Sequence, residues 1–224
     1  MPRRDMDSPR NLKSSRIIEI CRLCPVIPVL EVEQIEQATP LAQALIAGRL
    51  RVLEVTLRTD CALSAISEMS RVPNAIVGAG TLRTPEDVRA AKQAGASFGV
   101  SPGATDRLLD ACEETGLPLL PGAASASEVM TLLEKGYTAQ KFFPAEASGG
   151  RAALRSFGGP LPLVKFCPTG GITPEKATHY LELGNVMCVG GSWIAPTSLL
   201  RSGNWAEIET RARHASQLGG QASC

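Results

Sequence analysis

The sequence predicts an α/β protein, a single domain folded as a (β/α)8 TIM barrel with an extra N-terminal helix. Eight short runs rich in β-branched residues alternate with amphipathic stretches, and they begin about every 20 to 27 residues, the length of one strand–helix unit. The 224-residue chain is 44% hydrophobic but only 4% aromatic, so its core must be aliphatic, as in a buried parallel sheet. An open doubly wound sheet would instead carry a nucleotide-binding glycine fingerprint, which we do not find.

The order of the predicted elements follows the alternation of these runs. An extra helix is expected at 11–23, where it would cover the floor of the barrel. The predicted strands are 25–30, 52–58, 75–80, 97–101, 118–121, 139–143, 163–168 and 186–190. The predicted helices are 35–47, 62–71, 85–94, 105–115, 127–135, 174–183 and 205–217, with a shorter one at 150–157.

Capping residues support the helix boundaries. Thr84-Pro85 and Thr173-Pro174 each place an N-cap threonine before a proline at the first helical position, and acidic residues follow in the first turn. Glycines after the helical stretches act as stop signals, at Gly48, Gly95, Gly116, Gly136 and Gly184. These signals divide the chain into successive strand–helix units.

We expect three segments: a basic, disordered tail at 1–15, the barrel at 16–218 and a short C-terminal tail at 219–224. The tail and its border carry five cations: Arg3, Arg4, Arg10, Lys13 and Arg16. A nucleic-acid-binding arm is one interpretation of them, but a solvated tail is favoured because the net charge of the chain is only +1. The first 16 residues contain no apolar signal region, and no stretch has the length of a membrane span, which favours a cytoplasmic protein.

The cysteines favour reduced thiols over disulfides or a metal centre. There are seven, an odd number with irregular spacing. Cys21 and Cys24 form a C-x-x-C pair, but a zinc site needs two further ligands at suitable spacing, and His179 and His214 do not provide them. Whether Cys21 and Cys24 have a redox or metal role stays open, with packing at a helix end as the favoured interpretation.

Polar and glycine-rich residues follow the C-terminal ends of most predicted strands, which is the end where barrel enzymes hold their active sites. They occur at Arg58, 78–81 (GAGT), 101–103 (SPG), 141–146 (KFFPAE), 168–171 (PTGG) and 190–192 (GGS). A barrel with a purely structural role would not need them. We therefore expect a catalytic or binding site at this rim.

One predicted strand carries a carboxylate and a guanidinium with the same orientation. Glu54, Thr56 and Arg58 are two residues apart, so their side chains point to one face of the strand. If that face is the lumen, two charges enter the barrel together, which is costly unless they are used or paired. A structural Glu–Arg ion pair, or a pair that points outward, is the alternative.

Two lysines lie on predicted strands, Lys141 and Lys165. Burial of an amine favours its neutral form, and a neutral amine can attack a ketone to form an iminium, the electron sink for carbon–carbon cleavage. Lys165 lies four residues below Thr169, about 13 Å along a strand, which puts it near the barrel floor. Lys141 is therefore the preferred nucleophile.

Glycine pairs follow the last two predicted strands. Gly170-Gly171 precedes a helix start, and Gly190-Gly191 precedes Ser192. Backbone N–H groups in such turns bind phosphate, and barrels often hold phosphate after strands seven and eight. A tight turn with no ligand is the alternative for each pair alone.

Taken together, these motifs resemble one enzyme family, the 2-keto-3-deoxy-6-phosphogluconate (KDPG) aldolases, also known as 4-hydroxy-2-oxoglutarate aldolases. The motifs that carry the resemblance are EVTLRT (54–59), GAGT (78–81), SPG (101–103), KFFPAE (141–146), CPTGGI (167–172) and GGSW (190–193). They occur in the same order, each at a strand end, and the resemblance runs from about residue 16 to 217. The motif residues do not depart from the family pattern.

The resemblance implies a class I (Schiff-base) lyase that cleaves 2-dehydro-3-deoxy-6-phosphogluconate to pyruvate and glyceraldehyde 3-phosphate, a step of the Entner–Doudoroff pathway. It implies no metal or other cofactor, and a homotrimer. It makes Lys141 the residue that forms the Schiff base and Glu54 the general acid/base, acting through a water. It also implies the substrate contacts: the carboxylate on Arg58, Thr81 and Thr169, the pyruvyl part on Pro102 and Phe143, and the phosphate on Gly170, Gly171, Gly191 and Ser192.

Three alternatives stay open on the sequence. The substrate could be the phosphogalactonate epimer or an unphosphorylated 2-keto-3-deoxy acid, because a single polar contact can decide between epimers. A non-catalytic ligand-binding barrel is disfavoured by the combination of Lys141, Glu54 and Arg58. A metal-dependent class II aldolase is disfavoured because the chain has no histidine cluster.

Overall fold

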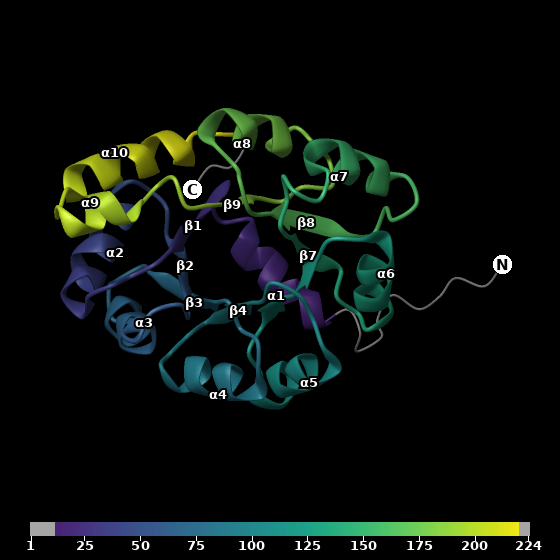
Figure 1. Ribbon diagram of the computed structural model, residues 1–224, viewed down its shortest axis with the longest axis horizontal. Coiled ribbons are helices and arrows are strands. Elements are labelled where there is room, and N and C mark those ends of the chain that lie inside the picture. Colours follow the sequence, from purple (N-terminus) through teal and green to yellow (C-terminus); the bar gives the residue numbers. More distant parts are fainter. Residues whose placement is uncertain (1–11, 220–224) are drawn as a thin grey trace.

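The computed structural model describes residues 12–219, which form parallel strands surrounded by helices (Figure 1). The strands are β1 (Val26–Leu30), β2 (Val52–Thr56), β3 (Ile76–Gly80), β4 (Phe98–Val100), β5 (Leu119–Leu120), β6 (Gly122–Ala123), β7 (Ala139–Phe142), β8 (Lys165–Pro168) and β9 (Val189–Gly191). The helices are α1 (Leu12–Cys21), α2 (Ala38–Ala47), α3 (Ala62–Ser70), α4 (Pro85–Gln93), α5 (Asp106–Thr115), α6 (Ala126–Glu134), α7 (Gly150–Gly158), α8 (Pro174–Leu181), α9 (Thr197–Arg201) and α10 (Trp205–Ser216). A short 3-10 helix, η2 (Ile35–Gln37), precedes α2.

All strand pairs are parallel, which confirms the predicted α/β class. One sheet has six strands in the order β5-β4-β3-β2-β1-β9, and a second has three in the order β6-β7-β8. Two isolated parallel bridges, Phe166–Val186 and Thr169–Gly190, connect β8 with the segment that leads into β9. The strands therefore follow a curled path, with helices on its outer side (Figure 1).

The structure differs from the predicted elements in several places. The strand predicted at 186–190 begins only at Val189, and the helix predicted at 35–47 starts with the separate 3-10 helix η2. The strand predicted at 118–121 is divided into β5 and β6, which are separated by Pro121. Proline has no N–H to donate to a strand ladder, which accounts for the break. The five-residue helix α9 was not predicted, because so short an element has no hydrophobic periodicity.

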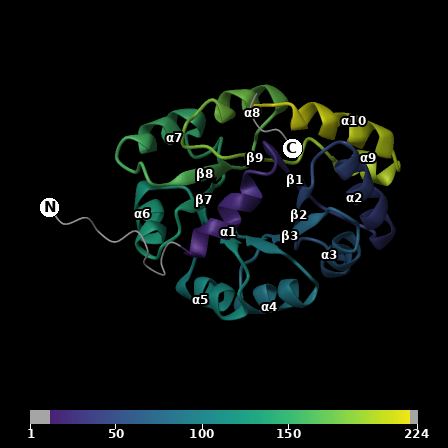
Figure 2. The same cartoon turned by 180° about the vertical axis from the view of Figure 1, so that it is seen from behind.

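The predicted extra helix is present as α1, and it crosses one end of the strands (Figure 2). Its Ser14 is buried and connects the helix to β7: the hydroxyl oxygen accepts from the N–H groups of Thr138 (2.9 Å) and Ala139 (3.3 Å) and donates to the Gly136 carbonyl (3.4 Å). The helix begins ahead of residue 16, where we expected the barrel to start. Most of the predicted N-terminal tail (1–11) and most of the C-terminal tail (220–224) lie outside the described residues.

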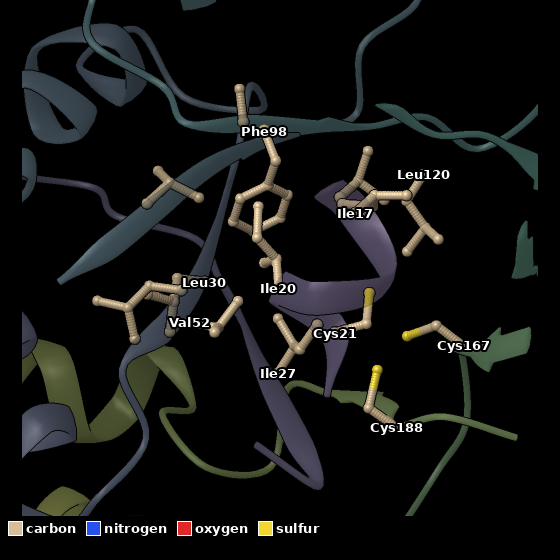
Figure 3. Close-up of a cluster of buried hydrophobic side chains, with 14 of the residues drawn as sticks. Ile17, Ile20, Cys21, Ile27, Leu30, Val52, Phe98, Leu120, Cys167 and Cys188 are labelled. Atoms are coloured by element: carbon tan, nitrogen blue, oxygen red, sulfur yellow. The ribbon is translucent and has the colours of Figure 1, made fainter. Parts of the chain in front are cut away.

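The core beneath the strands is mainly aliphatic, as the composition predicted. Ile20 of α1 packs beside Ile27 and Phe98 (Figure 3). The buried thiols of Cys21, Cys167 and Cys188 point toward one another in the same view. Hydrogen bonds with the Cys167 and Cys21 thiols, together with burial, raise the pKa of Cys188 well above its ordinary value, so the Cys188 thiol is kept protonated and unreactive.

Residues 12–219 contain neither a cluster of metal-binding side chains nor a membrane-spanning helix. No three His, Cys, Asp or Glu side chains in this part of the chain are grouped so that they could hold a metal ion. In the same residues, every helix is too short or too polar to cross a bilayer.

Candidate active site

Lys141 and Glu54 meet on the inner side of the curled strands. Lys141 is on β7 and Glu54 on β2, and the lysine Nζ donates to Oε1 of Glu54 at 3.2 Å. Their side chains are only 6% and 4% exposed. A buried ion pair is seldom an efficient way to stabilise a fold, so two charges retained here are a strong indication of a reactive centre.

The surroundings of the pair are shaped by two glycines and one aromatic ring. A Cβ atom added to Gly80 would lie 2.5 Å from Glu54 Oε1, so only glycine leaves room for the carboxylate. A Cβ atom on Gly78 would collide with the ring of Phe98. The Phe143 ring lies with its centroid 5.2 Å from Lys141 Nζ, within the range of a cation–π interaction.

Arg58 does not pair with Glu54, so the structural Glu–Arg pair considered from the sequence is wrong. Its nearest carboxylate is that of Glu31, at 3.9 Å, and the Arg58 side chain is 49% exposed. Arg58 lines a cleft at the ends of β1, β2 and β9 together with Thr56, Ser192 and Trp193. The structure therefore brings Arg58 and Ser192, which are far apart in the sequence, to one opening.

Thr81 has a left-handed backbone at the end of β3, with φ of +63°. A non-glycine residue in this region costs on the order of 1 kcal/mol or more and needs support from its neighbours. That support is present, because Leu57 N–H donates to Gly80 O (2.9 Å) and Leu82 N–H donates to Val100 O (3.1 Å). The strained conformation fixes Thr81 at the rim, as expected of a residue that contacts substrate.

The two glycine pairs lie at neighbouring strand ends, but only Gly170-Gly171 forms a turn: Gly190 and Gly191 belong to β9, so a turn at this pair is not found. Gly170 and Gly171 both have positive φ values, +106° and +76°, and Thr173 caps the helix that follows by accepting from Lys176 N–H at 3.4 Å. A Cβ atom on Gly191 would collide with the ring of Trp193, and one on Gly190 would collide with Thr169. This geometry suits backbone N–H groups that bind an anion.

The remaining predicted residues occupy two different positions. Pro102 follows β4, and its backbone comes so close to Gly122 of β6 that a Cβ atom there would collide with it. Lys165 is the first residue of β8, at the opposite end of that strand from Thr169, and its Nζ donates to Gly184 O at 2.7 Å. A structural role for Lys165 stays a prediction.

The sequence interpretation missed three residues at this rim: Glu31, Trp193 and Glu146. Glu31 lies near Arg58 in space, and only the fold could reveal that contact. Trp193 and Glu146 belong to the motifs GGSW and KFFPAE, so the sequence places both at strand ends, but it does not indicate which residues they contact.

The match to known proteins covers nearly the whole described chain. Residues 17–211 match the family profile described as KDPG and KHG aldolase. The 2-dehydro-3-deoxy-phosphogluconate aldolase of Pseudomonas aeruginosa is 47% identical over 204 residues, which cover 91% of this chain and 93% of that protein.

Two solved structures are similar to this one over almost their full lengths. KDPG aldolase from Legionella pneumophila, with pyruvate captured as a covalent carbinolamine intermediate, has a TM-score of 0.87 at 45% identity and covers 89% of this chain and 98% of its own. The 2-keto-3-deoxy-6-phosphogluconate aldolase of Zymomonas mobilis ZM4, solved with 3-phosphoglycerate, has a TM-score of 0.86 at 48% identity and covers 91% and 96%.

Proposed function

The chain belongs to the KDPG and KHG aldolase family, and we propose on this basis that Lys141 and Glu54 carry out its reaction. The enzyme is a class I aldolase, a carbon–carbon lyase. It cleaves 2-dehydro-3-deoxy-6-phosphogluconate to pyruvate and glyceraldehyde 3-phosphate, and it also acts on 4-hydroxy-2-oxoglutarate. The observation that carries the assignment of residues is the buried Lys141–Glu54 contact of 3.2 Å.

The first stage needs a nucleophilic amine. Glu54 lies within hydrogen-bond distance of Lys141 Nζ, so its carboxylate can accept the ammonium proton and leave the amine free to attack. Attack on the C2 ketone gives a carbinolamine. Glu54 then returns its proton to the departing hydroxyl, so that loss of water gives the iminium and restores the Glu54 carboxylate. The Legionella relative was captured with pyruvate as a carbinolamine, which supports the same stage here.

The second stage breaks the carbon–carbon bond. Glu54 takes the proton of the C4 hydroxyl, directly or through a water, as the C3–C4 bond breaks. The electron pair of that bond moves into the iminium to form an enamine, and the aldehyde leaves. Protonation of C3 and hydrolysis of the iminium then release pyruvate and restore the Lys141 amine.

The rim residues would hold the two ends of the substrate. Arg58, Thr81 and Thr169 would bind the carboxylate, where a guanidinium gives charge-assisted hydrogen bonds. Pro102 and Phe143 would pack against the pyruvyl part. The phosphate would be bound by backbone N–H groups of the Gly170-Gly171 turn and of Gly191 at the end of β9, together with the Ser192 hydroxyl. The Zymomonas relative was solved with 3-phosphoglycerate, which carries both a carboxylate and a phosphate.

Three further properties are part of the proposal. We infer that the strands close into a (β/α)8 barrel; the Thr169–Gly190 bridge and the single residue between β5 and β6 support closure. The resemblance to the family supports a homotrimer that serves the Entner–Doudoroff pathway. Five described cysteines are free thiols, which supports a reducing compartment and so a cytoplasmic enzyme: Cys21, Cys61, Cys112, Cys167 and Cys188.

Borohydride reduction in the presence of pyruvate, followed by peptide mass mapping, tests the proposed nucleophile. We expect a reduced pyruvyl adduct on Lys141. An adduct on Lys165 would keep the Schiff-base mechanism but overturn the assignment of the site. No adduct on any lysine of folded protein would overturn the class I mechanism for this chain.

A further inference from the structure

The carboxylate of Glu146 bridges two residues of α8. Glu146 follows β7, the strand that carries Lys141. Its Oε2 accepts from Lys176 Nζ and its Oε1 accepts from the Tyr180 hydroxyl, both at 2.5 Å. Lys176 and Tyr180 are four residues apart, so they lie on one face of the helix. Tyr180 is 2% exposed, so its hydroxyl needs a partner on the protein, and Glu146 provides it.

The rest of Glu146 packs against the turn that precedes α8. Its N–H donates to Gly170 O at 3.2 Å, and the neighbouring Ala145 N–H donates to Thr169 O at 2.8 Å. A Cβ atom on Gly171 would lie 2.9 Å from Glu146 Cγ, so the stem of the side chain lies against the α-carbon of this glycine. Glu146 therefore contacts both the glycine turn and the helix that follows it.

The glycine turn needs such support if it is to bind an anion. Two consecutive glycines have more backbone freedom than any other pair, and that freedom must be lost before their N–H groups converge on a ligand. Both glycines have positive φ values in the structure. A contact that holds the turn and the first turns of α8 in one arrangement would remove this cost from binding.

The charge of Glu146 is also accommodated. A free carboxylate beside a phosphate-binding turn would repel the ligand, but Lys176 neutralises it at 2.5 Å. The hydrogen bonds from Lys176 and Tyr180 lower the pKa of Glu146, so the carboxylate stays charged and paired at neutral pH.

We propose that Glu146, held by Tyr180 and Lys176, is a positioning residue that sets the Gly170–Gly171 turn for the phosphate of the substrate. The inference rests on the proposed function, which assigns phosphate to this turn. It makes Glu146 a determinant of preference for phosphorylated over unphosphorylated substrates, although it touches neither the substrate nor Lys141.

The test compares a phosphorylated substrate with an unphosphorylated one in the same variants. The variants are Tyr180→Phe, which removes only a hydroxyl, and Glu146→Gln, which removes the charge. For 2-dehydro-3-deoxy-6-phosphogluconate we expect KM to rise about fivefold to tenfold with kcat little changed, in line with loss of binding that is equal in ground and transition states. Inhibition by inorganic phosphate should weaken by a similar factor. For 4-hydroxy-2-oxoglutarate, KM and kcat should stay within about twofold.

Two controls separate the possible failures. Glu182→Gln breaks an ion pair between α7 and the other end of α8 (Arg151–Glu182, 2.7 Å) without touching the turn, and it should leave both substrates unaffected. Ser192→Ala removes a proposed phosphate contact directly, so it tests the phosphate site without involving Glu146.

Each result supports or overturns the inference. A change confined to the phosphorylated substrate in Tyr180→Phe supports it. If Ser192→Ala is selective for the phosphorylated substrate but Tyr180→Phe and Glu146→Gln affect both substrates equally, or neither, the positioning role is wrong. If Ser192→Ala, Tyr180→Phe and Glu146→Gln all affect the two substrates equally, the assignment of phosphate to this site fails, and the inference fails with it. Thermal unfolding curves show whether each variant is folded under the assay conditions. If Glu146→Gln is not, Tyr180→Phe, which removes only a hydroxyl, still tests the inference.

Discussion

Lys141 and Glu54 should have different mutational signatures, because one forms the covalent bond and the other moves protons. We expect Lys141→Ala to abolish turnover. Glu54→Gln should lower kcat about 10²-fold or more, while a pyruvyl adduct still forms slowly. Steady-state kinetics and borohydride trapping measure both effects. Lys165→Met, which removes the ammonium group that donates to Gly184 O, should retain turnover. A Lys165→Met enzyme without activity would contradict the assignment.

Gly80 makes room for the Glu54 carboxylate, so adding one methyl group there should impair catalysis. In Gly80→Ala the new Cβ atom would lie 2.5 Å from Oε1 and 2.7 Å from Cγ of Glu54, which forces the carboxylate to move. We expect kcat to fall by about 10²-fold, as for loss of a general base, while Lys141 keeps its place. Gly159→Ala is the matched control, since nothing lies within 4 Å of its added Cβ atom. Equal activity of the two variants would show that Glu54 does not need its position.

The contacts of single residues were only partly predictable. Parity along the strand predicted that Glu54 and Arg58 share one face, but it could not say that Glu54 would pair with Lys141 and Arg58 would lie near Glu31. Those partners come from strands and loops brought together by the fold. The same holds for Glu146, whose motif was visible while its partners on α8 were not.

Helices were predicted well where their ends carry capping residues. Thr173-Pro174 and Thr84-Pro85 begin α8 and α4, as expected, and both threonine hydroxyls accept from a backbone N–H of the first turn. Helix α9, which was not predicted, starts after Pro196 and has no side-chain cap. It is joined instead to the loop after β1 by the Arg201–Glu33 ion pair, with both guanidinium bonds under 3 Å (2.7 and 2.6 Å). A contact between residues so far apart in sequence cannot be inferred from local signals.

Capping predicts a difference between two threonine-to-alanine substitutions. The Thr105 hydroxyl caps α5 by accepting from Leu108 N–H at 3.3 Å, so Thr105→Ala should lower the free energy of unfolding by about 1 kcal/mol. Thr210 lies inside α10, where its hydroxyl donates to the Ala206 carbonyl at 2.9 Å. Alanine is the better helix former there, so Thr210→Ala should be neutral or slightly stabilising. Urea unfolding curves of the two variants measure the difference, and an equal loss in both would argue against a capping role for Thr105.

At the level of the whole molecule, the fold class followed from the repeating strand–helix pattern, and the extra helix at 11–23 was predicted too, but the hydrogen bonds that attach it to the strands were not. The predicted helix before the first strand is present, yet Ser14, inside the predicted tail, is buried and bonded to residues beside β7. A short basic segment has no hydrophobic pattern strong enough to reveal such a contact. Local sequence therefore identified the repeating unit, while tertiary packing determined where the folded part begins.

Acid should destabilise the molecule, because several carboxylates are held in their charged form by the fold. The pKa of Glu33 is lowered by its hydrogen bond with Arg201, that of Glu128 by the Ala124 N–H, and that of Glu146 by Lys176. In the unfolded chain these groups return to their ordinary value of 4.5. A lowered pKa stabilises the folded state above the unfolded value, and this contribution is lost as pH falls through the folded value. The free energy of unfolding should therefore be nearly constant near neutral pH and should decline below about pH 4.5.

Glu128→Gln tests whether these carboxylates cause the decline. At pH 7 the charged Glu128 accepts from Ala124 N–H (2.9 Å) and Ser125 N–H (2.8 Å), so the variant should unfold at a lower urea concentration than the parent chain. Once the pH is below the folded pKa, the parent carboxyl is protonated as well, and the two proteins should converge in stability. Urea titrations at neutral pH and at successively lower pH measure this convergence. A difference between variant and parent that stays the same at every pH would mean that the Glu128 side chain stabilises the fold through its shape and neutral hydrogen bonds, and that its charge contributes nothing.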